Sequence, residues 1–277
     1  MSSILTNNSA MVALETLRNV NRNLEGVQSE IATGKKVATA KDNAGIWAVA
    51  TVMSSDVESF KQISDSLNLG AATVGVARSA SEQIVKTLQE IKTLVVTAQG
   101  ENVDRVKIGA DITAKTDLIT GFIAAAQFNG LNLIDGTSTD DVNVLSSLNR
   151  AADGSVTAGN IVVSRVDLDT DILTDLGTLS VADNTDAATA MGTIEDLLQV
   201  AIDAAAAFGS SQASIKSQAD FVNTLTDSLK AGVGSLTDSD IEAASAKLQA
   251  LQVQQQLGVQ ALSIANQQPQ ALMSLFR

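Results

Sequence analysis

The residues that come closest to a chemical motif lie in an acidic segment of the chain. Asp167, Asp169 and Asp171 alternate with other residues, as at the start of the D-x-D-x-D-G pattern of calcium loops. A calcium loop also needs a glycine next and a later glutamate ligand. Ile172 occupies the glycine position, and no glutamate follows in the loop. Calcium binding is therefore an alternative, and we favour a solvated acidic surface.

A second group of carboxylates, from Glu195, Asp196 and Asp203, falls on one predicted helix. Paired carboxylates with a lysine can act as general acid and base in hydrolases. The chain has no histidine and no cysteine, so the usual general base and the thiol nucleophile are both missing. We expect these carboxylates to form a solvated helix face. We also expect the chain not to be an enzyme, with no catalytic residue, cofactor or metal site.

Charge and hydropathy argue against two classes of partner. The chain of 277 residues has 31 acidic and 18 basic side chains, a net charge of −13. Nucleic-acid binding needs lysines and arginines gathered on one face, but no basic run exceeds Lys35–Lys36. No stretch approaches the about 20 apolar residues of a membrane span, and the N-terminus lacks the features of a Sec signal. We expect no nucleic-acid partner, no membrane span and no cleaved Sec signal peptide.

The wider sequence predicts long helices. It has one proline, Pro269, and only 3% aromatic residues, which suits long thin helices better than a bulky core. Apolar residues spaced by 3, 4, 3 and 4 predict a coiled-coil seam that ends at Gly34: Leu17, Val20, Leu24, Val27 and Ile31. Further helices are predicted from Asp42 or Asn43 to about 99, over about 103–127 and over about 186–230.

The last helix is predicted to begin at a capping box formed by Ser239 and Glu242. Its expected seam consists of Ile241, Ala244, Leu248, Leu251, Gln255, Val259 and Leu262. The additional step of four residues before Val259 predicts weak supercoiling. Leu275 and Phe276 follow as an apolar tip.

The middle of the chain has a different texture. Phe128, Asn129 and Gly130 introduce an Asn-Gly turn next to a short apolar run, which predicts a β-hairpin. Residues 135–186 carry ten aspartates, no glutamate and two arginines, which sum to −8, and 160–166 reads as a strand.

These features predict a mainly α fold: a long antiparallel coiled-coil rod with paired N- and C-terminal helices, a β-hairpin and a small β-containing central insert. Helix pairs this thin bury little apolar surface and should be marginally stable alone. We therefore expect the ends of the chain to form an assembly interface. Its expected residues are Leu17, Val20, Leu24, Val27, Ile31, Ile241, Leu248, Leu251, Val259, Leu262, Leu275 and Phe276.

Three segments carry a family resemblance. Residues 31–45 read IATGKKVATAKDNAG, residues 126–130 read AQFNG and residues 262–277 read LSIANQQPQALMSLFR. They resemble, in order, the L-S-S-G-x-R-I-N-S-A-K-D-D-A-A-G, T-x-F-N-G and A-N-Q-x-P-Q-x-x-L-S-L-L-R motifs of bacterial flagellins. The stretch around Trp47 resembles short flagellins of alphaproteobacteria, with Trp47 expected as a buried anchor between rod helices.

The resemblance implies five segments. These are a filament-core helix in 1–42, rod helices with the hairpin in 43–135, a short acidic surface insert in 136–185, a returning rod helix in 186–236 and a second filament-core helix in 237–277.

The implied function is a secreted structural subunit that self-assembles into the extracellular flagellar filament for swimming motility. The implied partners are further copies of the chain, with or without other flagellins, the flagellar export apparatus, an export chaperone, and cap and junction proteins. A hook–filament junction protein of the same family is the alternative.

One departure from the family pattern concerns the segment read by the animal innate flagellin receptor. The family sequence resembles L-Q-R-V-R-E-L-A-V-Q, and this chain has LQEIKTLVV over residues 88–96. Glu90 replaces a basic residue and Thr93 replaces an acidic one. Because reversed charge in a desolvated contact opposes binding, weak or absent receptor activation is expected.

Overall fold

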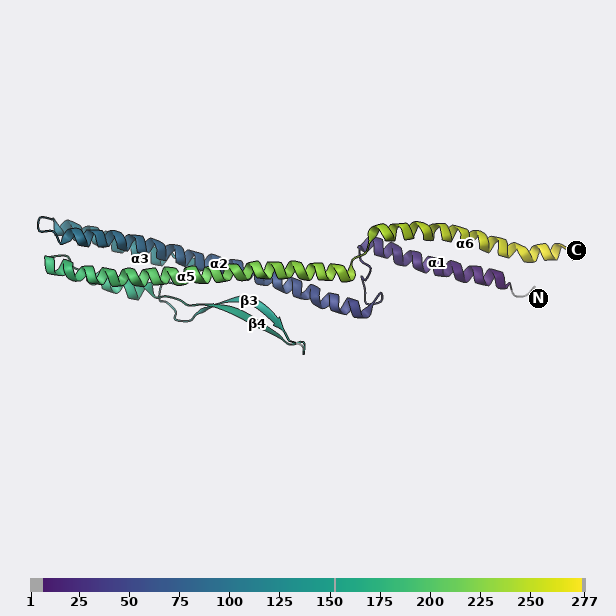
Figure 1. The fold of residues 1–277 in the computed structure, drawn as a ribbon, viewed down its shortest axis with the longest axis horizontal. Helices are drawn as coiled ribbons and strands as arrows, with labels where there is room; N and C mark the ends of the chain where they lie inside the picture. Colours follow the sequence, from purple (N-terminus) through teal and green to yellow (C-terminus); the bar gives the residue numbers. More distant parts are fainter. Residues whose placement is uncertain (1–6, 152, 276–277) are drawn as a thin grey trace. The chain divides into compact units, whose positions relative to one another are not determined.

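The computed structural model describes residues 7–151 and 153–275, with side chains described as far as Gln267. Figure 1 shows the elements. They are α1 (Asn8–Thr33), α2 (Ala44–Ala98), α3 (Arg105–Ala125), β1 (Gln127–Phe128), β2 (Leu131–Asn132), β3 (Val142–Arg150), β4 (Val156–Val163), the π-helix η1 (Asp169–Leu173), α4 (Thr174–Thr178), α5 (Asn184–Thr237) and α6 (Ile241–Leu275). The mainly α prediction is confirmed.

The chain divides into two compact units. The terminal unit contains the described residues up to Val57 and from Ser228 onward, and the rod unit is Glu58–Asp227. Both boundaries between the units fall inside a helix, one in α2 and one in α5. No loop separates the two units at these points.

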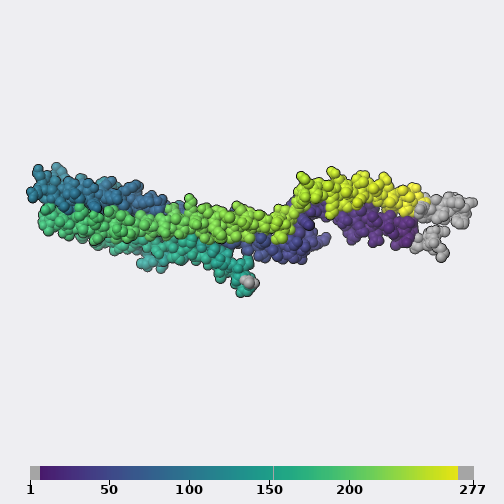
Figure 2. Space-filling model, in the orientation of Figure 1, coloured from purple at the N-terminus to yellow at the C-terminus, as the bar shows by residue number. Residues whose placement is uncertain are grey.

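The terminal unit is built on α1 and α6, which lie side by side (Figures 1 and 2). The Asn7 side chain caps α1 by accepting a 3.1 Å hydrogen bond from the N–H of Ala10. Gly34 ends α1 in the left-handed region at φ 70°, as its position after Thr33 predicts. The predicted capping box of α6 is wrong: Asp240 accepts from the N–H groups of the first turn, while the hydroxyl of Ser239 donates to Glu30.

In the rod unit, α2 presents an unbroken heptad seam. Inward positions recur every three or four residues, at Phe60, Ile63, Leu67, Gly70, Val74, Ala77, Ser81, Ile84, Leu88, Ile91, Val95 and Ala98, and all except Gly70 are buried. Cross-helix polar contacts tie α2 to α5, among them Ser64 to Asn223 at 2.9 Å and the ion pair of Lys92 with Glu195 at 2.5 Å. The sum of the paired residue numbers stays nearly constant, which identifies an antiparallel pair.

The hairpin predicted at Phe128, Asn129 and Gly130 is present as β1 and β2. Asn129 and Gly130 have φ values of 49° and 81°, so both central residues of the turn are left-handed, as a type I′ turn requires. Asn132 fixes the base of this hairpin because its amide donates a 2.7 Å hydrogen bond to the carbonyl of Ile123.

The acidic insert is ordered and supplies core residues as well as surface. β3 and β4 form an antiparallel hairpin with an irregular register between Leu145 and Ser147. After this hairpin, η1 packs beside α3. Leu168 immediately before η1 and Ile172 within it are both 0% exposed.

Candidate assembly surface

The contact between α1 and α6 is a narrow apolar seam. Its buried residues are Val20, Val27, Ala244 and Leu251, and Leu24, Ile31 and Leu248 pack against them while partly exposed. The structure therefore brings together residues from both predicted stripes. Because each helix contributes about one seam of side chains, most of its circumference stays outside the contact.

Two residues of the predicted α6 stripe do not belong to this intrachain seam. Ile241 is 44% exposed and Val259 is 54% exposed. Gly258 lies on the contact instead, since a Cβ there would be 3.2 Å from Cδ1 of Leu17. Half-buried Leu262 and buried Ala265 follow Gly258 at steps of four and three residues, so the heptad continues. The predicted additional step of four, from Gln255 to Val259, is wrong. The seam position is Gly258, which has no apolar side chain and so was not recognised in the sequence.

Polar contacts fix the alignment of the two helices. The Asn7 amide donates a 2.7 Å hydrogen bond to the carbonyl of Ala265. Near the middle of the pair, the Gln255 amide donates a 2.8 Å bond to the side-chain oxygen of Asn21. Gln255 was predicted on the seam, but its partner Asn21 carried no apolar signal that would have identified it.

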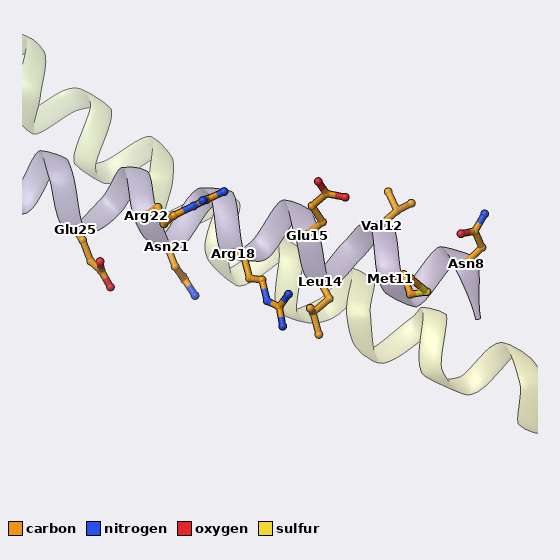
Figure 3. A pocket seen from close by; sticks show the side chains of 9 residues that line it. All are labelled: Asn8, Met11, Val12, Leu14, Glu15, Arg18, Asn21, Arg22 and Glu25. Atoms are coloured by element: carbon orange, nitrogen blue, oxygen red, sulfur yellow. The ribbon is translucent and has the colours of Figure 1, made fainter. Parts of the chain in front are cut away.

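A second stripe runs along α1 outside the seam. Met11, Leu14, Arg18, Asn21 and Glu25 follow one another at steps of 3, 4, 3 and 4, and their side chains line a shallow groove together with Asn8, Val12, Glu15 and Arg22 (Figure 3). Met11 is 64% exposed at the N-terminal end of this stripe. Among the described residues, Arg18 and Glu25 take part in no ion pair.

After Lys247, the outward surface of α6 carries no charge and exposes apolar side chains among glutamines. Val253, Leu257 and Ile264 are 55%, 58% and 64% exposed. Ile264 also borders a groove that α6 shares with the N-terminal end of α1, where Val12 is 59% exposed. No ionisable side chain occurs between Lys247 and Arg277.

Trp47 and the apolar tip complete the predicted positions in this unit. Trp47 is 39% exposed, so the expectation of a buried anchor is wrong. It lies in the first turn of α2, and the first buried residue of this helix is Ala50. Phe276 and the side chain of Leu275 lie outside the described residues.

In the predicted receptor segment, Glu90 and Thr93 are exposed, whereas Leu88, Ile91 and Val95 belong to the buried seam of α2. The Glu90 carboxylate forms an ion pair with Lys115 of α3. The hydroxyl of Thr93 donates a 3.0 Å hydrogen bond to the carbonyl of Gln89 in its own helix.

Three of the carboxylates considered for chemistry make structural contacts instead. Asp167 accepts a 2.9 Å hydrogen bond from the N–H of Thr170 and so caps η1. Glu195 pairs with Lys92, and Asp203 accepts from the amide of Gln199. In the described part of the chain, no group of three or more His, Cys, Asp or Glu side chains is placed to hold a metal ion.

Two loop carboxylates have a shifted pKa. Hydrogen bonds from the N–H and hydroxyl of Thr39 lower the pKa of Asp42, and those from the hydroxyl and N–H of Ser155 lower the pKa of Asp153. Both are exposed turn-stabilising groups, since hydrogen bonds to a carboxylate favour its charged form. Across the described helices, none combines the length and apolarity needed to cross a membrane.

The comparisons with known proteins agree with this arrangement of paired terminal helices. Residues 4–139 match the family model of the bacterial flagellin N-terminal helical region, and residues 191–276 match that of the C-terminal helical region. A flagellin of Brucella melitensis is 42% identical over 283 aligned residues, which cover 100% of both chains. The chain belongs to the bacterial flagellin family.

Other flagellins share its full length. Flagellin FljM of Caulobacter vibrioides is 40% identical, with 100% of this chain and 99% of the relative covered, and Flagellin C of Rhizobium meliloti is 35% identical, with 100% of each covered. A solved structure described as a flagellar hook-associated protein of Vibrio parahaemolyticus has the same fold, with a TM-score of 0.53 at 14% identity, covering 70% of this chain and 100% of the other.

Membership of the family gives the chain its function. It is a structural subunit that self-assembles into the extracellular filament of the bacterial flagellum and so serves motility. Flagellin names at about 40% identity over the full length support the filament subunit over the hook–filament junction alternative.

Proposed function

We propose that the outward surfaces of α1 and α6 are the contacts through which one subunit joins its neighbours in the filament. The observation that carries this proposal is the exposure of apolar side chains on both helices, outside a seam that is itself narrow. Met11 and Leu257, each more than half exposed, are typical of this surface. Apolar stripes of this kind mark interaction surfaces, and identical subunits joined head to tail form an open helical polymer.

The residues predicted at the assembly interface then divide into two groups. Seam residues such as Val20 and Leu251 hold the helix pair together within a subunit. Ile241 and Val259, exposed in the isolated chain, belong to contacts between subunits. Pairing within the subunit presents the outward stripes in a fixed orientation, so both groups are needed for assembly.

Seeded polymerisation followed by electron microscopy tests this proposal. Purified protein is depolymerised by heat, cooled and seeded with short filament fragments, beside a matched sample that lacks residues 1–40 and 240–277. We expect long filaments from the full chain alone. Filaments from both samples would overturn the assignment of assembly to the terminal helices, and none from the full chain would favour a junction role.

We infer that the remaining partners follow from the family. They are the flagellar export apparatus, an export chaperone, cap and junction proteins, and other flagellins where a filament contains several. We also infer that the chain has no catalytic activity and needs no cofactor. Support for this comes from the absence of histidine and cysteine, and from carboxylates that act as helix caps and ion-pair partners.

We propose, in addition, that this flagellin activates the innate flagellin receptor weakly or not at all. The ion pair of Glu90 with Lys115 supports this, because it leaves an acidic group where the family sequence has a basic one. Endotoxin-free monomer applied to a receptor reporter line should give little signal. The Glu90→Arg/Thr93→Glu variant should give more, and a strong response to the unaltered chain would contradict the proposal.

A further inference from the structure

The seam between α2 and α5 is weakest in its middle. On α2 the inward residues there are small: Gly70, Val74, Ala77 and Ser81. On α5 no residue is buried between Phe208 and Ile215, and half-buried Gln212 occupies the gap. On either side the seam is made of large aliphatic side chains that are almost fully buried, such as Leu67 and Ile84.

Gln212 makes this middle layer polar. Its side-chain oxygen accepts a 2.8 Å hydrogen bond from Nε of Arg78, and its amide lies 3.4 Å from the carbonyl oxygen of Ala71. Gly75 provides the space, because a Cβ there would lie 2.8 Å from Nε2 of Gln212. A layer of small and polar groups buries less apolar area than its neighbours, so it contributes less to holding the helices together.

The β3–β4 hairpin contacts both helices beside this layer. Val144 of β3 is 5% exposed and packs on Gly70 of α2, where a Cβ would lie 2.6 Å from Cγ1 of Val144. Two residues along β3, the carbonyl of Ser146 accepts a 3.0 Å hydrogen bond from the amide of Gln218 on α5. One strand thus contacts α2 and α5 at adjacent positions.

The irregular register of the hairpin makes the double contact possible. The break between Leu145 and Ser147 leaves Ser146 outside the ladder with β4. Its carbonyl is therefore free to accept a hydrogen bond from α5, and Ser146 itself is 7% exposed.

The two strands of the hairpin carry no acidic residue, although they lie in the most acidic segment of the chain. On the other face of the hairpin, Val162 of β4 is 56% exposed.

We propose that the β3–β4 hairpin is an intramolecular clasp that holds α2 and α5 together where their seam is weakest. The central insert then serves the rod of its own subunit, in addition to forming surface. Val144 seated on Gly70 and the Gln218–Ser146 hydrogen bond are the two contacts of this clasp, and Gly70 is required because any side chain there would displace Val144.

Substitution of Gly70 tests the clasp. Gly70→Ala should release the hairpin, and amide exchange in peptides covering 66–80 and 208–222 of the full-length monomer should quicken roughly tenfold, as expected for loss of local packing. Gly192→Ala is the matched control: it lies in α5 with no atom within 4 Å of its added Cβ, so alanine should slow exchange or leave it unchanged. Equal behaviour of the two variants would overturn the proposal.

A size exchange separates direct packing from general damage. Val144→Ala shortens the side chain that Gly70→Ala would meet, so the double variant should recover part of the lost protection. Val162→Ala, the same change on the exposed face of β4, should have no effect on these peptides. Additive losses in the double variant would contradict a direct contact.

A disulfide gives an independent readout. An added Cβ at Gly70 would lie 3.3 Å from Cβ of Val144, close to the separation of about 3.8 Å in disulfides, and the chain has no other cysteine. The Gly70→Cys/Val144→Cys variant should cross-link within the monomer on oxidation and raise the melting temperature relative to its reduced form. Failure to cross-link, or an unchanged melting temperature, would overturn the clasp.

Discussion

The α1–α6 pair of the terminal unit and the α2–α5 seam of the rod unit have the same heptad spacing, but they bury their side chains to different degrees. In the rod seam Leu67, Ile84 and Leu88 are 0% exposed. In the terminal pair the most buried member of the core cluster, Val27, retains 3%, and Leu24 is only partly buried. The rod unit can add β3, β4 and η1 to its helices, whereas the seam of the terminal pair has only α1 and α6.

This difference supports the proposed division of the chain into a part that folds within one subunit and a part that joins subunits. The rod unit buries the large aliphatic side chains of its seam within a single subunit, although it leaves others, such as Val106, exposed. The terminal pair aligns two helices through a narrow seam and leaves apolar stripes such as Val253 and Leu257 uncovered. Because two helices cannot cover each other on all sides, further copies of the chain are the natural source of the missing contacts.

The largest expected effect comes from placing a charge inside the terminal seam. Leu251→Asp buries a carboxylate at a position that is 7% exposed, which should cost about 3 kcal/mol or more and separate α1 from α6. Seeded polymerisation should give no filaments, with secretion intact and amide exchange unchanged in the rod unit. Normal filaments from this variant would show that the seam is not needed for assembly.

A charge on the outward stripe should separate assembly from folding. Leu257→Asp alters a residue that is 58% exposed, so the thermal stability of the monomer should change by less than about 0.5 kcal/mol. Filament growth should nevertheless fail because the carboxylate would be desolvated between subunits. Val106→Asp, at an 85% exposed position of α3, is the control and should polymerise. If both variants polymerise equally, α6 does not face a neighbour at this point.

Two glycines of the terminal pair sharpen the distinction between its faces. Gly26→Ala adds a methyl group to open space on α1 and should stabilise the monomer by about 1 kcal/mol through helix propensity. Gly258→Ala should gain less, because its Cβ would press against Cδ1 of Leu17 at 3.2 Å. Calorimetry of the two monomers measures the difference; a larger gain at Gly258 would exclude a tight contact there.

The smallest effect concerns the loop between α1 and α2. Hydrogen bonds from Thr39 lower the pKa of Asp42, so the carboxylate stabilises the folded loop above its ordinary value of 3.8 and this contribution disappears as the pH falls below it. Asp42→Asn should therefore lower stability slightly at neutral pH, and the difference from the unaltered chain should vanish in acid. Melting curves recorded from pH 7 to about pH 2.5 measure it, and a constant difference would contradict this role.

Sequence patterning identified what depends on local spacing. It predicted the α1 stripe, the left-handed Gly34 and the Asn129–Gly130 turn, because each is set by a few neighbouring residues. It missed Gly258 on the seam, because a count of apolar side chains omits glycine. Gly258 lies on the seam because its lack of a side chain leaves room for Leu17. Trp47 was misplaced because a large apolar residue was assumed to be buried.

Long-range contacts could not be predicted, because local spacing does not relate residues that are far apart in the sequence. Nothing in the local sequence relates Val144 to Gly70 or Ser146 to Gln218, which are separated by more than 70 residues in each case. The outward stripe of α1 was also missed, because it continues from Met11 and Leu14 into polar and charged residues, which gave no second apolar period. Its meaning depends on which face the partner helix leaves open.

The absence of charge from α6 after Lys247 has a consequence for how a filament responds to its surroundings. Between Lys247 and Arg277 no side chain gains or loses a proton in the accessible range, and no charge there can be screened by ions. Cohesion through this surface should thus be indifferent to acidity and ionic strength. Any disassembly triggered by acid or by salt must originate outside this stretch.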